Sequence, residues 1–261
     1  MKKLISKYSI LLTCILLTIV SVIVAISSKS FLFKYNLPVR NFVTLSAVIS
    51  HSPECEGIVD TGVLSSQCRP YEIHNSRASA AAINTVEGKT YMLTAAHFCE
   101  VESIFGIAQI VFDNQIEYNL EIIKDGERYP FEIVSYDTSN DLCLITSDYD
   151  ISENLVIADE MPDVGESVRS ISSPLGIAES NVNFHFSGVF SGCNEGMCYF
   201  TVPAISGSSG SVILNQDDEI VGMTQRALIG FPDVAIGAGR DEILKFLLRY
   251  EKESGIKIIP N

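Results

Sequence analysis

Basic residues are scarce in this sequence. Of its 261 residues, Lys and Arg account for 18 and Asp and Glu for 32, which gives a formal net charge of −14. Nucleic-acid binding depends on Lys and Arg that neutralise phosphates, so this balance argues against a nucleic-acid partner. Metal-binding patterns are missing too, because the sequence contains neither His-Glu-x-x-His nor paired Cys-x-x-Cys spacing. We therefore expect no metal and no other cofactor.

Repeats at a fixed period and low-complexity segments are also absent. The apolar fraction is 47% and the charged fraction is 19%. This composition is typical of a folded globular protein and excludes a disordered or collagen-like chain. The length allows one or two domains with a sizeable core.

A long, uncharged and strongly apolar stretch lies near the amino terminus. Residues 8–28 carry no charge and are mostly Ile, Leu and Val, and Lys2, Lys3 and Lys7 precede them. About 20 apolar residues suffice for a membrane-spanning helix, and the basic flank predicts a cytoplasmic amino terminus with the rest of the chain exported. The alternative is a signal peptide over residues 1–28, with a small-x-small cleavage site at 25–27. If the segment is an anchor, the exported part stays attached to the membrane. If it is a cleaved signal peptide, the exported part is secreted or periplasmic.

Cysteine usage agrees with export. Six of the seven cysteines follow the apolar segment: Cys55, Cys68, Cys99, Cys143, Cys193 and Cys198. An even number of cysteines in an exported domain favours disulfides. The best local pair is Cys193 with Cys198, which flank a turn-like sequence, and Cys55 with Cys68 is a second. Cys99 and Cys143 either pair or stay as buried thiols, and the connectivity stays open because six cysteines allow 15 pairings.

Short β-type runs broken by turn residues fill most of the exported part. The predicted strands are 42–49, 78–85, 89–94, 107–113, 116–124, 129–136, 142–146, 167–171, 182–190, 197–202, 211–214, 219–225 and 234–237. Such lengths and spacing are typical of sandwiches or barrels, and a break at 152–164 separates two halves of about six strands each. The clear helical stretch is 241–250, whose apolar residues fall on one face, and we expect it to pack on the barrel.

Three short stretches carry residue types that can do chemistry. They are 94–99 (Thr-Ala-Ala-His-Phe-Cys), 140–145 (Asn-Asp-Leu-Cys-Leu-Ile) and 206–211 (Ser-Gly-Ser-Ser-Gly-Ser). Taken singly, each has an ordinary structural interpretation, as a structural histidine, a turn aspartate or a flexible loop. Taken in the order His, Asp, Ser, at strand ends in two β-rich halves, they resemble the trypsin-like (chymotrypsin-fold) serine peptidases over residues 42–250.

The resemblance implies an all-β fold of two six-stranded antiparallel barrels with a carboxy-terminal helix. The apolar run described above predicts one hydrophobic amino-terminal helix before this fold. The expected organisation is a signal-anchor or signal peptide (1–28), a linker (29–41), a peptidase domain (42–252) and a tail (253–261). Within the domain, the barrels cover about 42–151 and 165–240, and the helix covers 241–250. Residues 165–168, 173–176, 219–223 and 234–237 are similar to the bacterial branch with the high-temperature-requirement proteases and glutamyl endopeptidases. About 50 residues follow Ser209, so we expect no PDZ domain.

The resemblance also implies roles for individual residues. Ser209 would be the nucleophile, His97 the general base and Asp141 the acid that orients it, and the N–H groups of Gly207 and Ser209 would form the oxyanion hole. These types suit acyl transfer, because a serine hydroxyl needs a base, imidazole titrates near neutrality and a carboxylate fixes the imidazole tautomer. Asp137 is a rival for the acid. The other rivals are His51, His74 and His185 for the base, and Ser208 and Ser211, which flank the nucleophile.

Substrate preference follows less directly. By the resemblance, Pro203 and Ala204 lie at the base of the primary specificity pocket, and Thr224, Gln225 and Arg226 line its wall. No carboxylate stands there to attract Lys or Arg, so we expect small or medium apolar residues at the cleaved bond. Arg226 either meets an acidic side chain or narrows the pocket and points to solvent, which we favour.

The predicted function is therefore that of a serine endopeptidase acting on polypeptides through an acyl-enzyme on Ser209. Ser208 stands where animal trypsin-like enzymes carry an Asp that pairs with a new amino terminus, so we expect no such activation switch. The alternatives are an inactive trypsin-like domain that binds proteins at a membrane, a non-catalytic spacer or adhesin, and an esterase with the same triad. The oligomeric state is left open.

Overall fold

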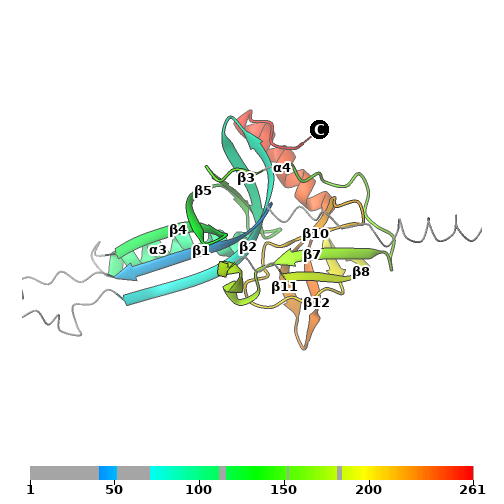
Figure 1. The fold of residues 1–261 in the computed structure, drawn as a ribbon, viewed down its shortest axis with the longest axis horizontal. Helices are drawn as coiled ribbons and strands as arrows, with labels where there is room; N and C mark the ends of the chain where they lie inside the picture. The colour runs from blue at the N-terminus through cyan, green and yellow to red at the C-terminus, as the bar shows by residue number, and fades with distance from the viewer. Residues whose placement is uncertain (1–40, 52–70, 112–115, 152, 181–183, 261) are drawn as a thin grey trace, which may run out of the picture. The chain divides into compact units, whose positions relative to one another are not determined.

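Two closed antiparallel β-barrels of six strands each form the framework of the chain (Figure 1). The computed structural model describes residues 41–51, 71–111, 116–151, 153–180 and 184–260. The first barrel has the strand order β1-β2-β3-β6-β5-β4 and the second has the order β10-β11-β12-β9-β8-β7. The predicted fold class is confirmed for these residues.

The strands of the first barrel are β1 (Phe42–His51), β2 (Tyr71–Val86), β3 (Lys89–Thr94), β4 (Ile116–Lys124), β5 (Glu127–Asp137) and β6 (Leu142–Ser147). Those of the second are β7 (Ser167–Ser172), β8 (Phe184–Asn194), β9 (Met197–Phe200), β10 (Val212–Leu214), β11 (Ile220–Leu228) and β12 (Phe231–Gly239). A 3₁₀ segment, η3 (Pro174–Ser180), lies between β7 and β8. The bounds of β3 and β4 are those that the sequence pattern predicts.

Each barrel has an apolar core of its own. Leu45, Met92 and Ile145 are fully buried in the first, and Phe200 and Ile213 in the second. On strands such as β5 and β9, more buried and more exposed side chains alternate, as expected for a sheet with one face on a core. The loops at the strand ends are therefore held by two barrels, each of which has its own packed core.

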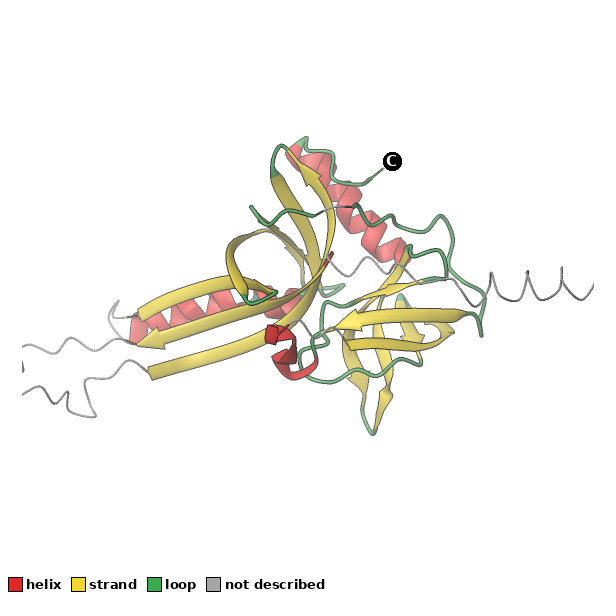
Figure 2. Cartoon of the chain, in the orientation of Figure 1, coloured by secondary structure: helices red, strands yellow, loops and turns green. Residues whose placement is uncertain are grey.

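The carboxy-terminal helix α4 (Arg240–Ser254) packs on the second barrel and reaches the first. Its buried face includes Ile243, Phe246 and Leu247, as the sequence predicts. Tyr250 lies with its ring centroid 6.1 Å from that of Tyr91 on β3. The helix ends at Gly255 in the left-handed conformation, and the segment after it is held down, because Ile258 is fully buried. Figure 2 shows this helix in red.

One predicted strand is wrong. Residues 107–113 were expected to be extended, but most of them belong to the helix α3 (Val101–Val111), which follows the short helix α2 (Ala96–Cys99). The run is rich in Ile and Val, which favour strands. Tertiary packing overrides this preference: Val101 and Ala108 are buried on one helix face, and the ring of Phe105 stacks on Tyr118 of β4 at 4.6 Å.

Several predictions lie outside the described residues. They concern the hydrophobic helix and linker of residues 1–40 and the pair Cys55 and Cys68. Within the described residues, no helix combines the length and the apolar character needed to cross a membrane.

Candidate active site

The structure brings His97 and Asp141 into direct contact. His97 lies in α2, immediately after β3, and Asp141 immediately precedes β6, which pairs with β3. The Asp141 carboxylate oxygens lie 2.8 Å and 3.1 Å from His97 Nδ1, and one of them also accepts the backbone N–H of His97 at 2.8 Å. The hydrogen bond to Asp141 raises the pKa of the His97 imidazole above its ordinary value, although burial opposes this.

Asp137, the rival acid, organises the loop that carries Asp141. Its carboxylate accepts hydrogen bonds from the N–H of Ser139 and from the N–H and side-chain amide of Asn140, at 3.0–3.2 Å. It also pairs with Arg249 of α4 at 3.2 Å. Burial alone would raise its pKa, but the hydrogen bonds from Asn140 and the charge of Arg249 lower it. The carboxylate of Asp137 therefore serves its own loop.

A disulfide joins the two elements that carry His97 and Asp141. Cys99 and Cys143 are bonded, with their Cα atoms 6.5 Å apart and both residues buried. Cys99 follows His97 by two positions, and Cys143 follows Asp141 by two positions; we call His97 and Asp141 the dyad. The second disulfide, between Cys193 and Cys198, links directly paired residues of β8 and β9 and is the local pair that the sequence favoured.

Three of the five backbone N–H groups of the serine loop, residues 207–211, donate hydrogen bonds. The N–H of Ser208 donates to Ile205 O, that of Gly210 to Thr224 O and that of Ser211 to Ser208 O, at 2.8–3.1 Å. Within residues 207–211, only the N–H groups of Gly207 and Ser209 donate to no acceptor in the described part of the chain.

The Ser209 hydroxyl donates to the carbonyl of Gln225 at 3.0 Å. Gln225 is the extra residue of a β-bulge in β11, because Thr224 pairs with Gly237 and Arg226 with Ile236. Its side-chain amide donates to the carbonyls of Asn140 and Asp141. Gln225 thus touches the nucleophile candidate with its backbone and the Asp141 loop with its side chain. Sequence reasoning missed this double contact, since nothing local in the pattern marks the bulge.

Ser79 of β2 is a second bridge that sequence reasoning missed. Its N–H donates to Ser209 O and its hydroxyl to Gly207 O, both at 2.8 Å. Its carbonyl accepts the hydroxyl of Thr94, three residues before His97, at 2.8 Å. The Ser209 loop and the His97 element are therefore both fastened to one residue of the first barrel.

The other predicted residues are placed as follows. Pro203 is half-buried, Ala204, Thr224 and Gln225 are buried, and Arg226 is exposed. The N–H of Ala204 donates to Pro232 O at 2.7 Å, which holds the predicted pocket base against β12. The role of these residues in a pocket stays a prediction.

The rival residues lie elsewhere or serve local structure. His51 and His74 are on β1 and β2, where the ring of His51 lies 5.2 Å from that of Tyr71, and His185 is on β8. The Ser208 hydroxyl accepts the N–H of Ile205 at 3.3 Å, inside the loop turn, and Ser211 is fully buried.

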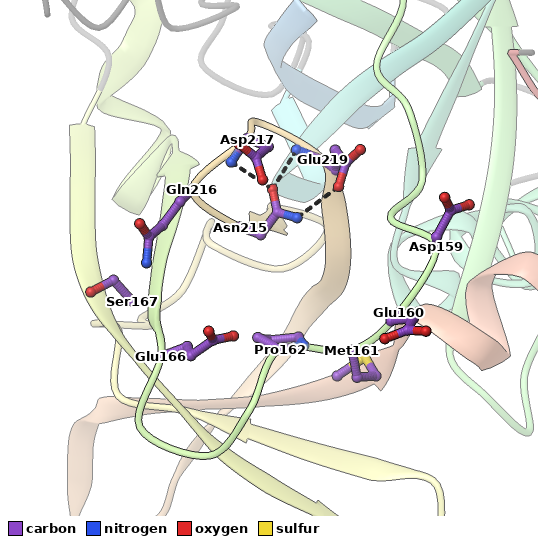
Figure 3. A pocket seen from close by; sticks show the side chains of 10 residues that line it. All are labelled: Asp159, Glu160, Met161, Pro162, Glu166, Ser167, Asn215, Gln216, Asp217 and Glu219. Atoms are coloured by element: carbon purple, nitrogen blue, oxygen red, sulfur yellow. Dashed lines mark hydrogen bonds between the residues drawn. The ribbon is translucent and has the colours of Figure 1, made fainter.

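A separate cavity of about 570 Å³ lies beside the turn between β10 and β11 (Figure 3). Its lining carries five carboxylates, from Asp159, Glu160, Glu166, Asp217 and Glu219. Asn215 organises the turn by accepting two backbone N–H groups and donating to Glu219. None of the three stretches that carry chemistry lines this cavity. The described residues also contain no cluster of His, Cys, Asp and Glu suited to a metal ion.

A family model and several solved structures match this chain. A family model described as a trypsin-like peptidase domain matches residues 79–223. An HtrA-type protease solved with a decapeptide is similar in structure, with a TM-score of 0.58 and 14% identity over 84% of this chain and 65% of that one. A Mycobacterium tuberculosis protein in an inactive form gives a TM-score of 0.54 and 12% identity, over 84% of this chain and 91% of that one.

The serine endoprotease of Yersinia pestis gives a TM-score of 0.53 and 16% identity, over 80% of this chain and 63% of that one. At such identities the likeness concerns the fold, and this chain spans less than two thirds of the Yersinia protein. No curated protein sequence matches this chain.

Proposed function

Because this chain belongs to the family of trypsin-like peptidase domains, which are serine-type endopeptidases, we propose that it hydrolyses polypeptides through His97, Asp141 and Ser209. One observation carries the proposal. The Asp141 carboxylate binds both the Nδ1 atom and the backbone N–H of His97, at 2.8 Å each. A carboxylate held in this way fixes the ring orientation and favours the tautomer with its proton on Nδ1. The other ring nitrogen, Nε2, then has a lone pair with which to take a proton.

The serine loop supports an oxyanion hole formed by Gly207 and Ser209. In a planar trans peptide the C=O and the N–H point in opposite directions. The carbonyl of Ser206 accepts the N–H of Leu175 at 2.7 Å, and that of Ser208 accepts the N–H of Ser211. The N–H groups of Gly207 and Ser209 therefore point away from those contacts. Two preorganised donors of this kind stabilise the negative charge that develops on a carbonyl oxygen during acyl transfer.

The reaction then proceeds in two acyl transfers. The Ser209 hydroxyl leaves the carbonyl of Gln225, gives its proton to His97 Nε2, and its oxygen bonds to the substrate carbonyl carbon. His97 then protonates the amine as the C–N bond breaks, which leaves an ester on Ser209. In the second half, water gives a proton to His97 and attacks the ester, and His97 returns the proton to the Ser209 oxygen as the carboxylic acid departs.

The substrate proposal is a polypeptide with a small or medium apolar residue before the cleaved bond. The predicted pocket base, Pro203 and Ala204, offers no charge, and the exposure of Arg226 supports its pointing to solvent. We place the enzyme outside the cytoplasm, either anchored by residues 8–28 or released after cleavage. The two disulfides within the described residues support an oxidising compartment.

The test is covalent labelling of the full chain, purified with mild detergent under oxidising conditions. A fluorophosphonate probe should label Ser209 of the wild type, as located by mass spectrometry, and the Ser209→Ala variant should take no label. Ser211→Ala is the matched control, because this neighbouring serine is fully buried, and it should keep the label. All three proteins are then incubated with an unfolded protein, and the cut sites are mapped.

Cuts that require Ser209 would support the peptidase and reveal its preference at the cleaved bond. A folded wild type that takes no label and makes no cut would contradict the proposal and favour the inactive, protein-binding alternative. Labelling without peptide cleavage, but with ester hydrolysis, would favour the esterase alternative.

A further inference from the structure

We propose that Ser79, a residue of the first barrel, is a positioning residue for the oxyanion-hole loop of the second barrel. The inference rests on the proposed function and deepens it. Ser79 lies on β2 and its exposed fraction is only 2%. It touches none of the reacting atoms, so its effect on the reaction has to pass through the backbone that it holds.

Every polar group of Ser79 binds a residue next to the site. The hydroxyl donates to Gly207 O at 2.8 Å and accepts the N–H of Ser173 at 2.9 Å. The N–H donates to Ser209 O, and the carbonyl accepts the hydroxyl of Thr94. A hydroxyl has one proton and two lone pairs, so this side chain is used as both donor and acceptor. The residue joins the Ser209 loop, the segment after β7 and the end of β3.

These bonds orient the two donors of the oxyanion hole. Ser79 holds the carbonyls of Gly207 and Ser209, which lie on either side of Ser208, and so it fixes the peptide planes before and after the Ser208–Ser209 peptide. The bond from Leu175 N–H to Ser206 O fixes the plane that contains the Gly207 N–H. Loss of the hydroxyl would leave the Gly207–Ser208 peptide held only on its N–H side, by the bond to Ile205 O, and would leave the buried carbonyl of Gly207 without that donor.

Close packing makes these bonds consequential. A Cβ atom placed on Gly210 would lie 2.1 Å from Ser79 O, and one on Gly207 would lie 2.6 Å from Ser173 O. The loop backbone is therefore pressed against both β2 and the segment after β7. Hydrogen bonds in such a dry, closely packed region are strong, and an unpaired partner there is costly.

Ser147 offers a matched control within the same barrel. It is also 2% exposed, its hydroxyl donates to Pro130 O at 2.6 Å, and it accepts the N–H of Tyr149 at 3.3 Å. The hydroxyl thus has the same kinds of partner as that of Ser79, but both partners lie outside the serine loop. Ser147→Ala should cost similar stability and leave the oxyanion hole intact.

The experiment compares the wild type, Ser79→Ala and Ser147→Ala, all as full chains, on a fluorogenic peptide and with a peptide aldehyde. Misplacing catalytic groups by about 1 Å can cost about 100-fold, so we expect kcat of Ser79→Ala to fall by about 10–100-fold with KM unchanged. The affinity for the aldehyde, whose adduct places an oxyanion in the hole, should fall by the same factor. The midpoint of the pH profile, which reports His97, should stay unchanged.

The pair Ser79→Thr and Ser79→Val keeps the test decisive if the alanine variant fails to fold. The two side chains have the same shape, and only Thr keeps the hydroxyl, so kcat should be about tenfold or more higher for Thr. Equal kcat for this pair would overturn the inference. So would a Ser79→Ala variant as active as Ser147→Ala, or a pH midpoint that moves together with kcat. If the wild type neither labels at Ser209 nor cleaves, the proposed function itself fails and this inference fails with it.

Discussion

Replacing Cys99 and Cys143 together by alanine should destabilise the protein by about 4 kcal/mol. The disulfide closes a loop with a sequence separation of 44. In the chain-entropy account, a loop of that length removes about 13 cal/mol/K from the unfolded ensemble, which is about 4 kcal/mol at 25 °C. The same arithmetic for Cys193 and Cys198, whose separation is 5, gives only about 2 kcal/mol.

Urea denaturation of the two double variants and the wild type measures this difference. The sequence has no tryptophan, so circular dichroism or tyrosine fluorescence would follow the transition. We expect the variant without the bond between Cys99 and Cys143 to be less stable than the other variant by about 2 kcal/mol. Its slope in urea should be at least as steep, because removal of this bond releases the longer loop of the unfolded chain. Equal or reversed costs would refute the loop-closure reasoning.

The position of this bond adds a catalytic expectation. Because the cysteines lie two residues after His97 and Asp141, the bond restrains both dyad elements. Below the unfolding transition, kcat should therefore fall more on removal of this disulfide than on removal of the bond between β8 and β9. The opposite order would show that β3 and β6 hold the dyad without it.

Three further predictions follow from single contacts. The hydrogen bond to Asp141 raises the pKa of His97, which must be neutral to act as the base. We therefore expect kcat/KM to rise with pH with a midpoint above 6.5. Asp141→Asn should lower that midpoint and should lower kcat by up to about 10⁴-fold. Gly210→Ala should lower the free energy of unfolding in urea by about 3 kcal/mol or more, because its φ is +85° and the new Cβ would meet Ser79 O. Burial raises the pKa of the Glu251 carboxyl, but two backbone N–H groups donate to it and lower that pKa below its ordinary value. Its contribution to the stability of the protein is therefore present above pH 4.5 and is lost as the pH falls. Glu251→Gln should lower the free energy of unfolding by about 1–3 kcal/mol at pH 7 and by much less near pH 3.

The sequence predicts the barrels well because their strands carry local signals. β3 follows a turn at residues 87–88, β4 precedes a turn at residues 125–126, and both strands have the predicted bounds. The apolar face of α4 follows a helical period. Residues 107–113 show the limit of such signals. A short apolar run is ambiguous between strand and helix, and here the stacking of Phe105 on Tyr118 accompanies the helical outcome.

The candidate site divides in the same way. His97, Asp141 and Ser209 could be named in advance because each stands in a short motif of a recognisable family. The resemblance names Gln225 only as part of the pocket wall and does not name Ser79. The bridging contacts of both residues could not be predicted, because they depend on partners 84 and 128 positions away in the sequence. A glutamine at a bulge and a serine in an alanine-rich strand have no local mark that distinguishes them from ordinary residues. Their hydrogen bonds to the Asp141 loop and the Ser209 loop become visible only in the three-dimensional structure.

The division of labour between the barrels has a consequence for control of activity. The first barrel carries His97 and Asp141, the second carries Ser209, and each barrel has its own core. The contacts across the junction include hydrogen bonds, such as those of Ser79 and Gln225 and that from Thr44 to the Ser173 hydroxyl at 2.6 Å. A small shift between the barrels can therefore break the alignment of the base, the nucleophile and the oxyanion hole while both cores stay packed. Removal of one of these junction hydrogen bonds should accordingly lower kcat by a larger factor than a substitution inside either core that costs the same free energy of unfolding.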